Sequence, residues 1–359
     1  MSRDLSALDA RTPDADVAER LGISVGAVEL VRDSEVIDLH LESYIPPRLY
    51  GYDLFQRNDR HFLRGRYFGH VDFPRILDGG YTGGMWSIAT NVARGARGRW
   101  RSLQENVAGL RSTIEATDGR LKVVTTPLEW REARAAGAHA CLLSVQGGNA
   151  YDAAPSPAEL SDVVRVTVLH LSNSQLGRTS SPYRWGGAPG LTDRGRVFIE
   201  ELDAARMFVD LAHIDRAGFW HAVEAHDRSL PLIVTHTGVT GVKEHWRNID
   251  DDQIRAVADT GGVVGIMFQT SFLRRRGQPN DASLVVDHLE HVIDVGGEAA
   301  AAIGSDYDGA IIPPPDLRDG FAAFYRITQV MLDRGWPEAR IRRVLGENFL
   351  ASFEHLRPS

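Results

Sequence analysis

The sequence predicts a single α/β domain built as a (β/α)8 barrel. Eight short apolar or β-branched runs alternate with polar loops and with stretches of helical periodicity over 359 residues, which is typical of βα units around a parallel sheet. Four of these runs end in histidine and one ends in aspartate. Because the carboxyl ends of all strands in such a barrel meet at one mouth, these five side chains are expected to share a cavity.

The expected elements follow one another along the chain without a linker. The strands are expected at 36–40, 81–90, 142–146, 166–170, 207–213, 232–236, 263–268 and 301–306. Residues 193–205 are expected to form a helix capped by Thr192. Residues 251–260 are expected to form another, closed by Gly261 and Gly262, because glycine tolerates the left-handed conformation that ends a helix.

The whole chain, residues 1–359, is interpreted as one domain in which residues 1–35 form an N-terminal helical extension. An open doubly wound sheet is the structural alternative, but that fold is expected to carry a phosphate-binding glycine loop that opens an early helix. The glycine-rich segment 79–84 precedes or enters a strand instead, and it lacks the Lys-Ser/Thr pair of a P-loop. We interpret this segment as a turn, and the barrel stays the favoured fold.

Composition excludes several classes of protein. The chain is 43% hydrophobic and 25% charged with a net charge of -8, so neither disorder nor nucleic-acid binding is indicated. The arginine clusters at 97–101 and 274–276 are interpreted as solvated loop charge, and the single cysteine, Cys141, as a small core residue. No apolar run approaches the roughly 20 residues that span a bilayer. No secretory signal or membrane anchor is recognised at either end, so a cytoplasmic location is expected.

Histidine is concentrated at the strand ends. It makes up 13 of 359 residues, so eight strand ends should carry roughly 0.3 histidines by chance. Imidazole and carboxylate groups that converge in a pocket are common ligands of divalent transition metals. A lone strand-end histidine is more often structural, but Asp38 and Asp210 precede two of them and either support them or cap the barrel rim. The whole set favours a metal site: His40, His170, His213, His236 and Asp306.

Nine segments, taken in order and spacing, carry a family resemblance between Val36 and Phe353. They are 37–42, 144–149, 168–170, 190–195, 209–213, 235–237, 247–248, 304–309 and 346–350. Together they resemble the membrane (renal) dipeptidases, a family of amidohydrolase-like metal-dependent hydrolases. The resemblance implies a zinc-dependent dipeptidase barrel with two metals joined by a glutamate and a hydroxide, and it suggests a homodimer.

The resemblance also implies a role for each candidate residue. His40 and Glu42 would hold one metal, while His213 and His236 would hold the other. Gln146 falls at the bridging position. The implied metal-site residues are therefore His40, Glu42, Gln146, His213, His236 and Asp306.

The remaining roles concern catalysis and substrate binding. The resemblance implies that Asp306 binds the water and shuttles its proton, that His170 donates a hydrogen bond to the carbonyl oxygen or tetrahedral intermediate, and that Arg247 clamps the terminal carboxylate. Without the resemblance, Arg247 could equally be a surface arginine paired with the acidic run 250–252. Asn149 is a candidate substrate contact or a turn-stabilising residue. The aromatic segment 44–68 is a candidate lid or a segment packed on the barrel top.

Two departures from the family pattern bear on the metals. The family's His-x-Asp reads His40-Leu41-Glu42 here, and the bridging glutamate is Gln146, whose neutral amide cannot offset repulsion between two dications. Two such ions about 3.5 Å apart repel by roughly 19 kcal/mol at an effective dielectric of about 20. The anions among the ligands fall from three to two, Glu42 and Asp306.

Three outcomes stay open at the sequence level. The favoured one is a single strongly bound zinc ion on His213 and His236 with Asp306 nearby, which would hydrolyse a dipeptide or related small amide. Alternatively, Glu42 swings across to act as the bridge. In the third, hydrolysis is lost or altered and the pocket binds or processes another small carboxylated molecule, for example by a lyase or isomerase reaction.

Overall fold

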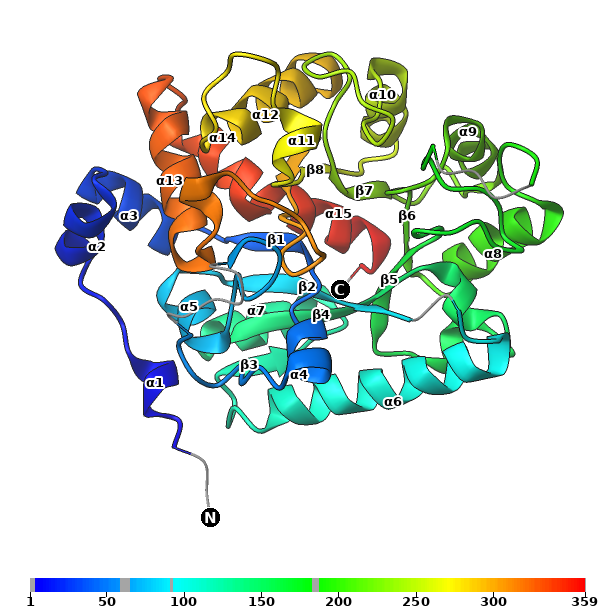
Figure 1. The fold of residues 1–359 in the computed structure, drawn as a ribbon, viewed down its shortest axis with the longest axis horizontal. Helices are drawn as coiled ribbons and strands as arrows, with labels where there is room; N and C mark the ends of the chain where they lie inside the picture. Colours follow the sequence, from blue (N-terminus) through cyan, green and yellow to red (C-terminus); the bar gives the residue numbers. More distant parts are fainter. Residues whose placement is uncertain (1–3, 59–64, 91–92, 183–186, 359) are drawn as a thin grey trace.

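Eight parallel strands form a closed barrel in the computed structural model, which describes residues 4–58, 65–90, 93–182 and 187–358. They pair in the order β1-β2-β4-β5-β6-β7-β8-β9. A parallel bridge between Leu41 and Tyr307 joins the end of the path to its start, and the backbone nitrogen of Asp306 donates to the oxygen of His40 at 3.1 Å. The predicted (β/α)8 barrel is confirmed (Figure 1). Its strands are β1 (Ile37–Leu41), β2 (Gly83–Ala89), β4 (His139–Gln146), β5 (Val163–Thr167), β6 (Phe208–Asp210), β7 (Leu232–Thr237), β8 (Val264–Ile266) and β9 (Ala301–Ile303).

Three of the expected strands end three residues earlier than the sequence pattern indicates. β5, β6 and β9 end three residues before His170, His213 and Asp306, so these side chains project from the loops that leave the strands. His213 and Asp306 have φ values of 67° and 63°. Such left-handed backbone cannot continue a strand, which is why the predicted boundaries are wrong there.

Two further details of the sheet differ from expectation. A short additional strand, β3 (Leu121–Val123), pairs with β4 outside the eight-strand path. Within the glycine-rich segment 79–84, the turn is confined to its start, because Gly83 and Gly84 begin β2. A Cβ on Gly83 would lie 2.1 Å from the Trp130 ring, so the glycine lets helix α7 (Pro127–Ala135) pack closely against this strand.

Helices surround the barrel (Figure 1). As predicted, Thr192 caps α8, and its hydroxyl accepts a hydrogen bond from Gly195 N at 3.1 Å. Helix α10 ends at Ala258, two residues before the predicted end, and Asp250 caps its start. The helices after β2 are α6 (Ala96–Glu115), α7 (Pro127–Ala135), α8 (Asp193–Ala204), α9 (Arg216–Ala225), α10 (Asp251–Ala258), α11 (Thr270–Leu273), α12 (Ser283–Gly296), α13 (Gly320–Asp333), α14 (Glu338–Arg342) and α15 (Asn348–Leu356).

In the part of the chain that the structure describes, three helices precede the first strand: α1 (Ser6–Asp9), α2 (Asp14–Leu21) and α3 (Val25–Arg32). Helix α3 packs against α13. The Ser24 hydroxyl at its start donates to Gln329 Oε1 at 2.7 Å, and Arg32 Nε donates to the Tyr325 hydroxyl at 3.0 Å. These contacts tie the N-terminal helices to the barrel. Helices α4 (Ile45–Tyr50) and α5 (Phe73–Asp78) lie between β1 and β2.

The core and surface largely follow the composition. Cys141 is fully buried in β4, as predicted. The arginines at 274–276 are exposed in a loop, but those at 97–101 lie in helix α6, so their assignment to a loop is wrong. Arg99 donates to Asn149 O at 2.9 Å.

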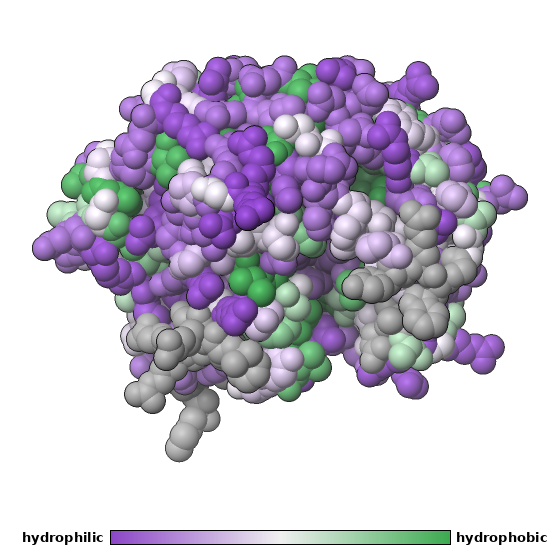
Figure 2. Space-filling model, turned by 45° about the horizontal axis from the view of Figure 1, so that its top comes forward, coloured by the Kyte–Doolittle hydropathy of each residue, from purple (hydrophilic) through white to green (hydrophobic). Residues whose placement is uncertain are grey.

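Hydrophilic residues dominate the face in Figure 2. Within the described ranges, we find no helix with the length and apolar character needed to cross a membrane.

Acid destabilisation is expected from a histidine in β4. His139 is buried, its Nδ1 lies 3.0 Å from Tyr81 O, and its Nε2 accepts from Trp86 Nε1 at 3.3 Å. Burial lowers the pKa of His139 to about 4. The unfolded chain, with a pKa near 6.5, therefore binds this proton first, so about 3 kcal/mol of stability is lost as the pH falls from about 6.5 to 4.

The His139→Gln variant tests this expectation, because it removes the titrating group and keeps an acceptor. Denaturant unfolding at several pH values should show a smaller loss of stability between pH 7 and 4 than in the wild type. Curves that fall in parallel would contradict the assignment to His139.

Candidate active site

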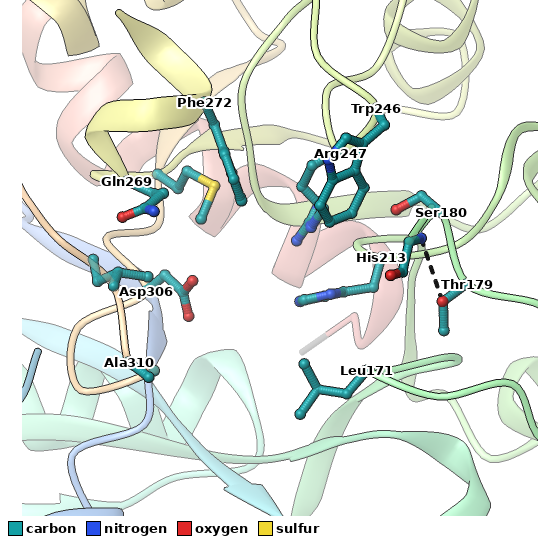
Figure 3. A pocket seen from close by; sticks show the side chains of 14 residues that line it. Leu171, Thr179, Ser180, His213, Trp246, Arg247, Gln269, Phe272, Asp306 and Ala310 are labelled. Atoms are coloured by element: carbon teal, nitrogen blue, oxygen red, sulfur yellow. Dashed lines mark hydrogen bonds between the residues drawn. The ribbon is translucent and has the colours of Figure 1, made fainter. Parts of the chain in front are cut away.

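A cavity of about 190 Å³ opens where the strands end, and His213, Arg247 and Asp306 line it. Figure 3 shows His213 and Asp306 on opposite sides of the cavity, with Arg247 reaching in between them and Trp246 and Phe272 nearby. The cavity thus combines a few convergent polar groups with apolar walls, which is the usual composition of a small-molecule site.

The candidate metal ligands gather around His236. His213 Nε2 and His236 Nε2 lie 2.9 Å apart, and the His40 ring stacks on His236 with a centroid distance of 3.8 Å. One ligand atom from each of His40, His236 and Asp306 falls within 4.8 Å of the other two. The structure therefore brings together four residues from β1, β7 and the loops after β6 and β9, as the fold was expected to do.

The hydrogen bonds behind His236 leave its Nε2 free to bind a metal. The Thr235 hydroxyl donates its one proton to Asp210 Oδ2 at 2.7 Å and lies 2.8 Å from His236 Nδ1. Because that proton is already used, His236 Nδ1 must carry the hydrogen and donate to the hydroxyl. Nε2 is then unprotonated, which is the arrangement of a metal-binding histidine. Asp210 thus supports His236 through Thr235.

The hydrogen bond behind His40 has the opposite direction. Arg165 Nη2 lies 2.9 Å from His40 Nδ1. The buried Nε2 has no hydrogen-bond partner and is 3.7 Å from Asp306 Oδ1. Asp38 does not bond to this ring. Its Oδ1 accepts from the backbone nitrogens of His40 and Ser305 at 3.0 and 2.8 Å, so Asp38 fastens the closure of the barrel.

The two residues that depart from the family pattern are buried at the ends of β4 and β1. Gln146 ends β4, with its Nε2 3.3 Å from His213 Nε2 and its buried Oε1 unpartnered. Glu42 follows β1 and is 4% exposed, and its Oε1 is also unpartnered. Burial raises the pKa of Glu42 to about 8, although Arg165 and Arg48 oppose that rise. Among the described residues, Glu42 is not part of the group within 4.8 Å.

The loop that carries Asp306 is tightly folded. Its φ of 63° is uncommon for a residue other than glycine, and such strain is found most often at functional sites. A Cβ on Gly309 would lie only 2.4 Å from Asp306 Oδ1, so a glycine there allows the loop to fold over the carboxylate. Burial and the nearby Glu42 raise the pKa of Asp306, while Arg247 opposes that rise.

The candidate ligand histidines are neutral. Burial is the main cause that holds the pKa of His40, His213 and His236 well below the ordinary value. The charges of Arg165 and Arg247 lower these pKa values further. A histidine must be neutral to bind a metal, so the pocket keeps these rings in the competent charge state.

His170 and Asn149 occupy different places. The His170 ring lies 4.8 Å from the His213 ring, and its pKa is lowered to about 3 by burial and by Arg247 and Arg165. His170 is therefore a neutral imidazole beside the candidate ligand His213. Asn149 lies in the 3-10 turn Gly148–Tyr151 and is not among the described residues that line the cavity.

Arg247 is buried rather than on the surface, with 4% of its area exposed. Its Nη2 donates to His236 O at 2.9 Å, and its Nε has no partner. Burial lowers the pKa of Arg247 to about 10, against the opposing effect of Asp306 and Asp210, so the side chain stays charged at neutral pH. A buried cation with an unused donor is suited to binding an anionic group.

The candidate lid, 44–68, includes residues 59–64, which are outside the described residues, so its role stays a prediction.

Sequence reasoning missed Arg165. This residue lies in the middle of β5, is fully buried and contacts both His40 and Asp210. The signal was available, because a single charged residue interrupts the apolar run Val163-Val164-Arg165-Val166. Buried charges are rare in a barrel strand unless they are paired or functional.

The fold and this site together define a class of protein, the metal-dependent hydrolases built on a (β/α)8 barrel. A family model described as membrane dipeptidase (Peptidase family M19) matches residues 26–357. The chain belongs to this family, and the predicted resemblance is confirmed.

Solved structures agree with this assignment. The dipeptidase AC, a metallo peptidase of family M19, is 26% identical with a TM-score of 0.80 and covers 91% of this chain and 99% of its own. A metallo peptidase from Rhodobacter sphaeroides, liganded with a phosphinate mimic of the dipeptide L-Ala-D-Ala, is 26% identical with a TM-score of 0.75 and coverages of 90% and 99%. The probable dipeptidase PvdM from Pseudomonas aeruginosa shares the fold at 14% identity, with a TM-score of 0.75 and coverages of 92% and 98%.

A relative of unassigned function was also found. An uncharacterized protein in the pqqA 5' region of Klebsiella pneumoniae is 33% identical over 165 residues, or 45% of this chain. The chain spans 59% of the length of that relative.

Proposed function

We propose that this chain is a zinc-dependent dipeptidase-like hydrolase that cleaves a dipeptide or a related small amide with a free carboxylate. One observation carries the proposal. The Nε2 atom of His213, which lines the pocket together with Arg247 and Asp306, lies 2.9 Å from the Nε2 atom of His236. The Rhodobacter sphaeroides relative, solved with a mimic of L-Ala-D-Ala, supports a dipeptide as the substrate class.

The residues present fit one metal ion. Two neutral imidazoles and the Asp306 carboxylate supply the nitrogen and oxygen ligands that zinc prefers. When bound, the ion would make its water more acidic and polarise the substrate carbonyl. We propose one zinc ion per chain, held mainly by His213 and His236. The cytoplasm and a homodimer are the proposed location and assembly.

Side chains of the protein carry the remaining catalytic and substrate-binding roles. Asp306 accepts the proton from the attacking water and returns it to the departing amine. His170, neutral beside the ligands, donates a hydrogen bond to the carbonyl oxygen as negative charge develops there. Arg247 pairs with the terminal carboxylate and fixes the orientation of the substrate. Asn149 keeps the proposed role of a substrate contact.

The Arg247→Lys variant should bind substrate more weakly. Lysine keeps the charge but cannot form the planar two-donor pair with a carboxylate. We expect kcat/KM for a dipeptide to fall roughly 10- to 100-fold, mainly through KM, since a hydrogen bond to a charged group contributes about 1.5–3 kcal/mol. Steady-state kinetics with a dipeptide and its C-terminal amide check the role. The wild type should prefer the free acid, and the variant should lose most of that preference.

A matched control for this variant is Arg255→Lys in helix α10, an arginine paired with Asp252 whose side chain is 53% exposed. It should leave both substrates unaffected. If Arg247→Lys kept the full preference for the free acid, Arg247 would not be the carboxylate-binding group.

A second candidate function is favoured by Gln146 and Glu42, which depart from the family pattern. In this alternative the pocket binds a small carboxylated molecule without hydrolysing it, or converts it by another reaction. The same buried Arg247 would hold the carboxylate. Metal binding by itself therefore does not separate the two functions, whereas turnover does.

The test uses protein purified without chelator and a panel of L,L dipeptides, L,D dipeptides and N-acyl amino acids. The proposal expects amine release from some members of the panel, loss of that activity with a chelator, and recovery with Zn2+. Calorimetric binding of panel members without turnover by the zinc-loaded chain would favour the second function and contradict the first.

A further inference from the structure

We propose that the buried guanidinium of Arg165 takes the place of a second metal ion, and that it makes His40 a hydrogen-bond donor rather than a metal ligand. This inference rests on the single-ion site of the proposed function. It assigns a positioning role to a residue that the family resemblance does not mention. It also explains how a barrel of this class can keep His40 while lacking an anionic bridge.

Arg165 is built into the interior of the barrel. Its side chain has no exposed area, and Nη1 pairs with Asp210 Oδ2 at 3.2 Å. Nη2 has two hydrogens, which it donates to His40 Nδ1 at 2.9 Å and to Ser144 Oγ at 3.0 Å, and Ser87 Oγ lies farther away, at 3.4 Å. Contacts with residues of β1, β2, β4 and β6 hold the guanidinium in one position behind the His40 ring.

The direction of the Arg165–His40 hydrogen bond is fixed by chemistry. A guanidinium has donors and no acceptor, so His40 Nδ1 must accept with its lone pair. The neutral ring then carries its hydrogen on Nε2, the atom that faces the site. A histidine with this tautomer cannot offer Nε2 to a metal. His236, whose Nδ1 donates to Thr235, has the opposite tautomer and can.

The charges of the site agree with this arrangement. Asp210 pairs directly with Arg165, and Glu42 and Asp306 are the further carboxyl groups that act on it. Gln146, beside His213, adds no charge. A guanidinium and one dication repel half as strongly as two dications at the same separation and dielectric. One ion together with Arg165 therefore needs less anionic compensation than two ions.

The consequence for His40 is a defined role. Its Nε2 is buried, has no hydrogen-bond partner within 3.5 Å, and faces Gln146 and Asp306, whose Oδ1 lies 3.7 Å away. From this position His40 can donate to the Asp306 carboxylate or to an oxygen held between the two. Arg165 acts only through His40 and Asp210, so it is a positioning residue and not a catalytic one.

The first test reads the tautomer directly in the whole chain. Long-range 1H–15N correlation spectra of histidine-labelled protein, assigned with a His40→Asn variant, are recorded without metal and after Zn2+ addition. We expect His40 to keep its hydrogen on Nε2 in both states, and His236 to keep its hydrogen on Nδ1. Zinc-dependent loss of the Nε2 hydrogen of His40 would overturn the proposal.

The second test counts ions by mass spectrometry after equilibration with Zn2+ and removal of free metal. The wild type, Gln146→Glu and Arg165→Lys should each bind one ion, because a buried cation stays beside His40. The double variant Arg165→Met with Gln146→Glu should bind two. Two ions in the wild type or in Gln146→Glu, or one ion in a folded double variant, would contradict the inference.

Failure of this inference can be told apart from failure of the proposed function. If the double variant does not fold, as judged by circular dichroism, the wild-type spectra and the Gln146→Glu count still decide the question. One ion and an unchanged His40 tautomer in a chain without turnover would reject the hydrolase and leave the role of Arg165 in place. Turnover by a wild type that binds two ions would support the hydrolase and reject the proposed role of Arg165.

Discussion

Asp306→Asn should lower kcat for dipeptide hydrolysis by about 10²- to 10⁴-fold, which is the usual contribution of a positioned general acid or base. The amide has nearly the same shape as the carboxylate but cannot accept the proton of the attacking water. Asparagine also tolerates the left-handed backbone at this position better than most residues, so the loop should keep its conformation. Steady-state kinetics and a zinc count on the same sample measure the effect.

The matched control is Asp118→Asn, an aspartate with a similar φ of 53° and a side chain that is 87% exposed. It should have the kinetics of the wild type. If Asp306→Asn bound zinc and retained more than about a tenth of the wild-type kcat, the proton transfer would have to be assigned to another group.

His236→Gln should empty the metal site. Losing a residue behind a ligand already weakens metal binding by about 10- to 100-fold, so losing the ligand itself should weaken zinc affinity by more than 100-fold and abolish turnover. Competition with a chromophoric zinc chelator gives the affinity. A surface histidine provides the control: His291→Gln, which loses only the contact with Asp251 at 2.7 Å, should bind zinc normally.

A graded version of this prediction tests the hydrogen bonds behind His236. Thr235→Val removes the hydroxyl that orients the ring and keeps the ligand. Zinc affinity should fall by about 10- to 100-fold, less than for His236→Gln. Equal affinities for Thr235→Val and the wild type would mean that the Asp210-Thr235-His236 chain does not set the ligand tautomer.

The barrel could be predicted from the sequence because eight apolar runs recur with helices between them, and local patterning alone requires strands there. The helix caps at Thr192 and Asp250 depend on local sequence in the same way. The predicted ends of the strands are less accurate. The positive φ values of His213 and Asp306 depend on how their loops fold across the mouth of the barrel, which local sequence does not determine.

The candidate site likewise has one part that the sequence predicts and one part that it does not. The gathering of His40, His213, His236 and Asp306 followed from the rule that strand ends converge in a barrel. The role of Arg165 could not be derived, since its contact with His40 joins β5 to β1 across the barrel interior. Whether a histidine offers a lone pair or a hydrogen depends on the partner behind it, and that partner is a tertiary feature.

Anomalous diffraction from crystals equilibrated with Zn2+ and collected at the zinc edge tests the central claim most directly. We expect one strong peak per chain, within bonding distance of His213 Nε2 and His236 Nε2, and no peak between His40 and Glu42. Two peaks on either side of Gln146, or no peak beside His213 and His236, would contradict the account.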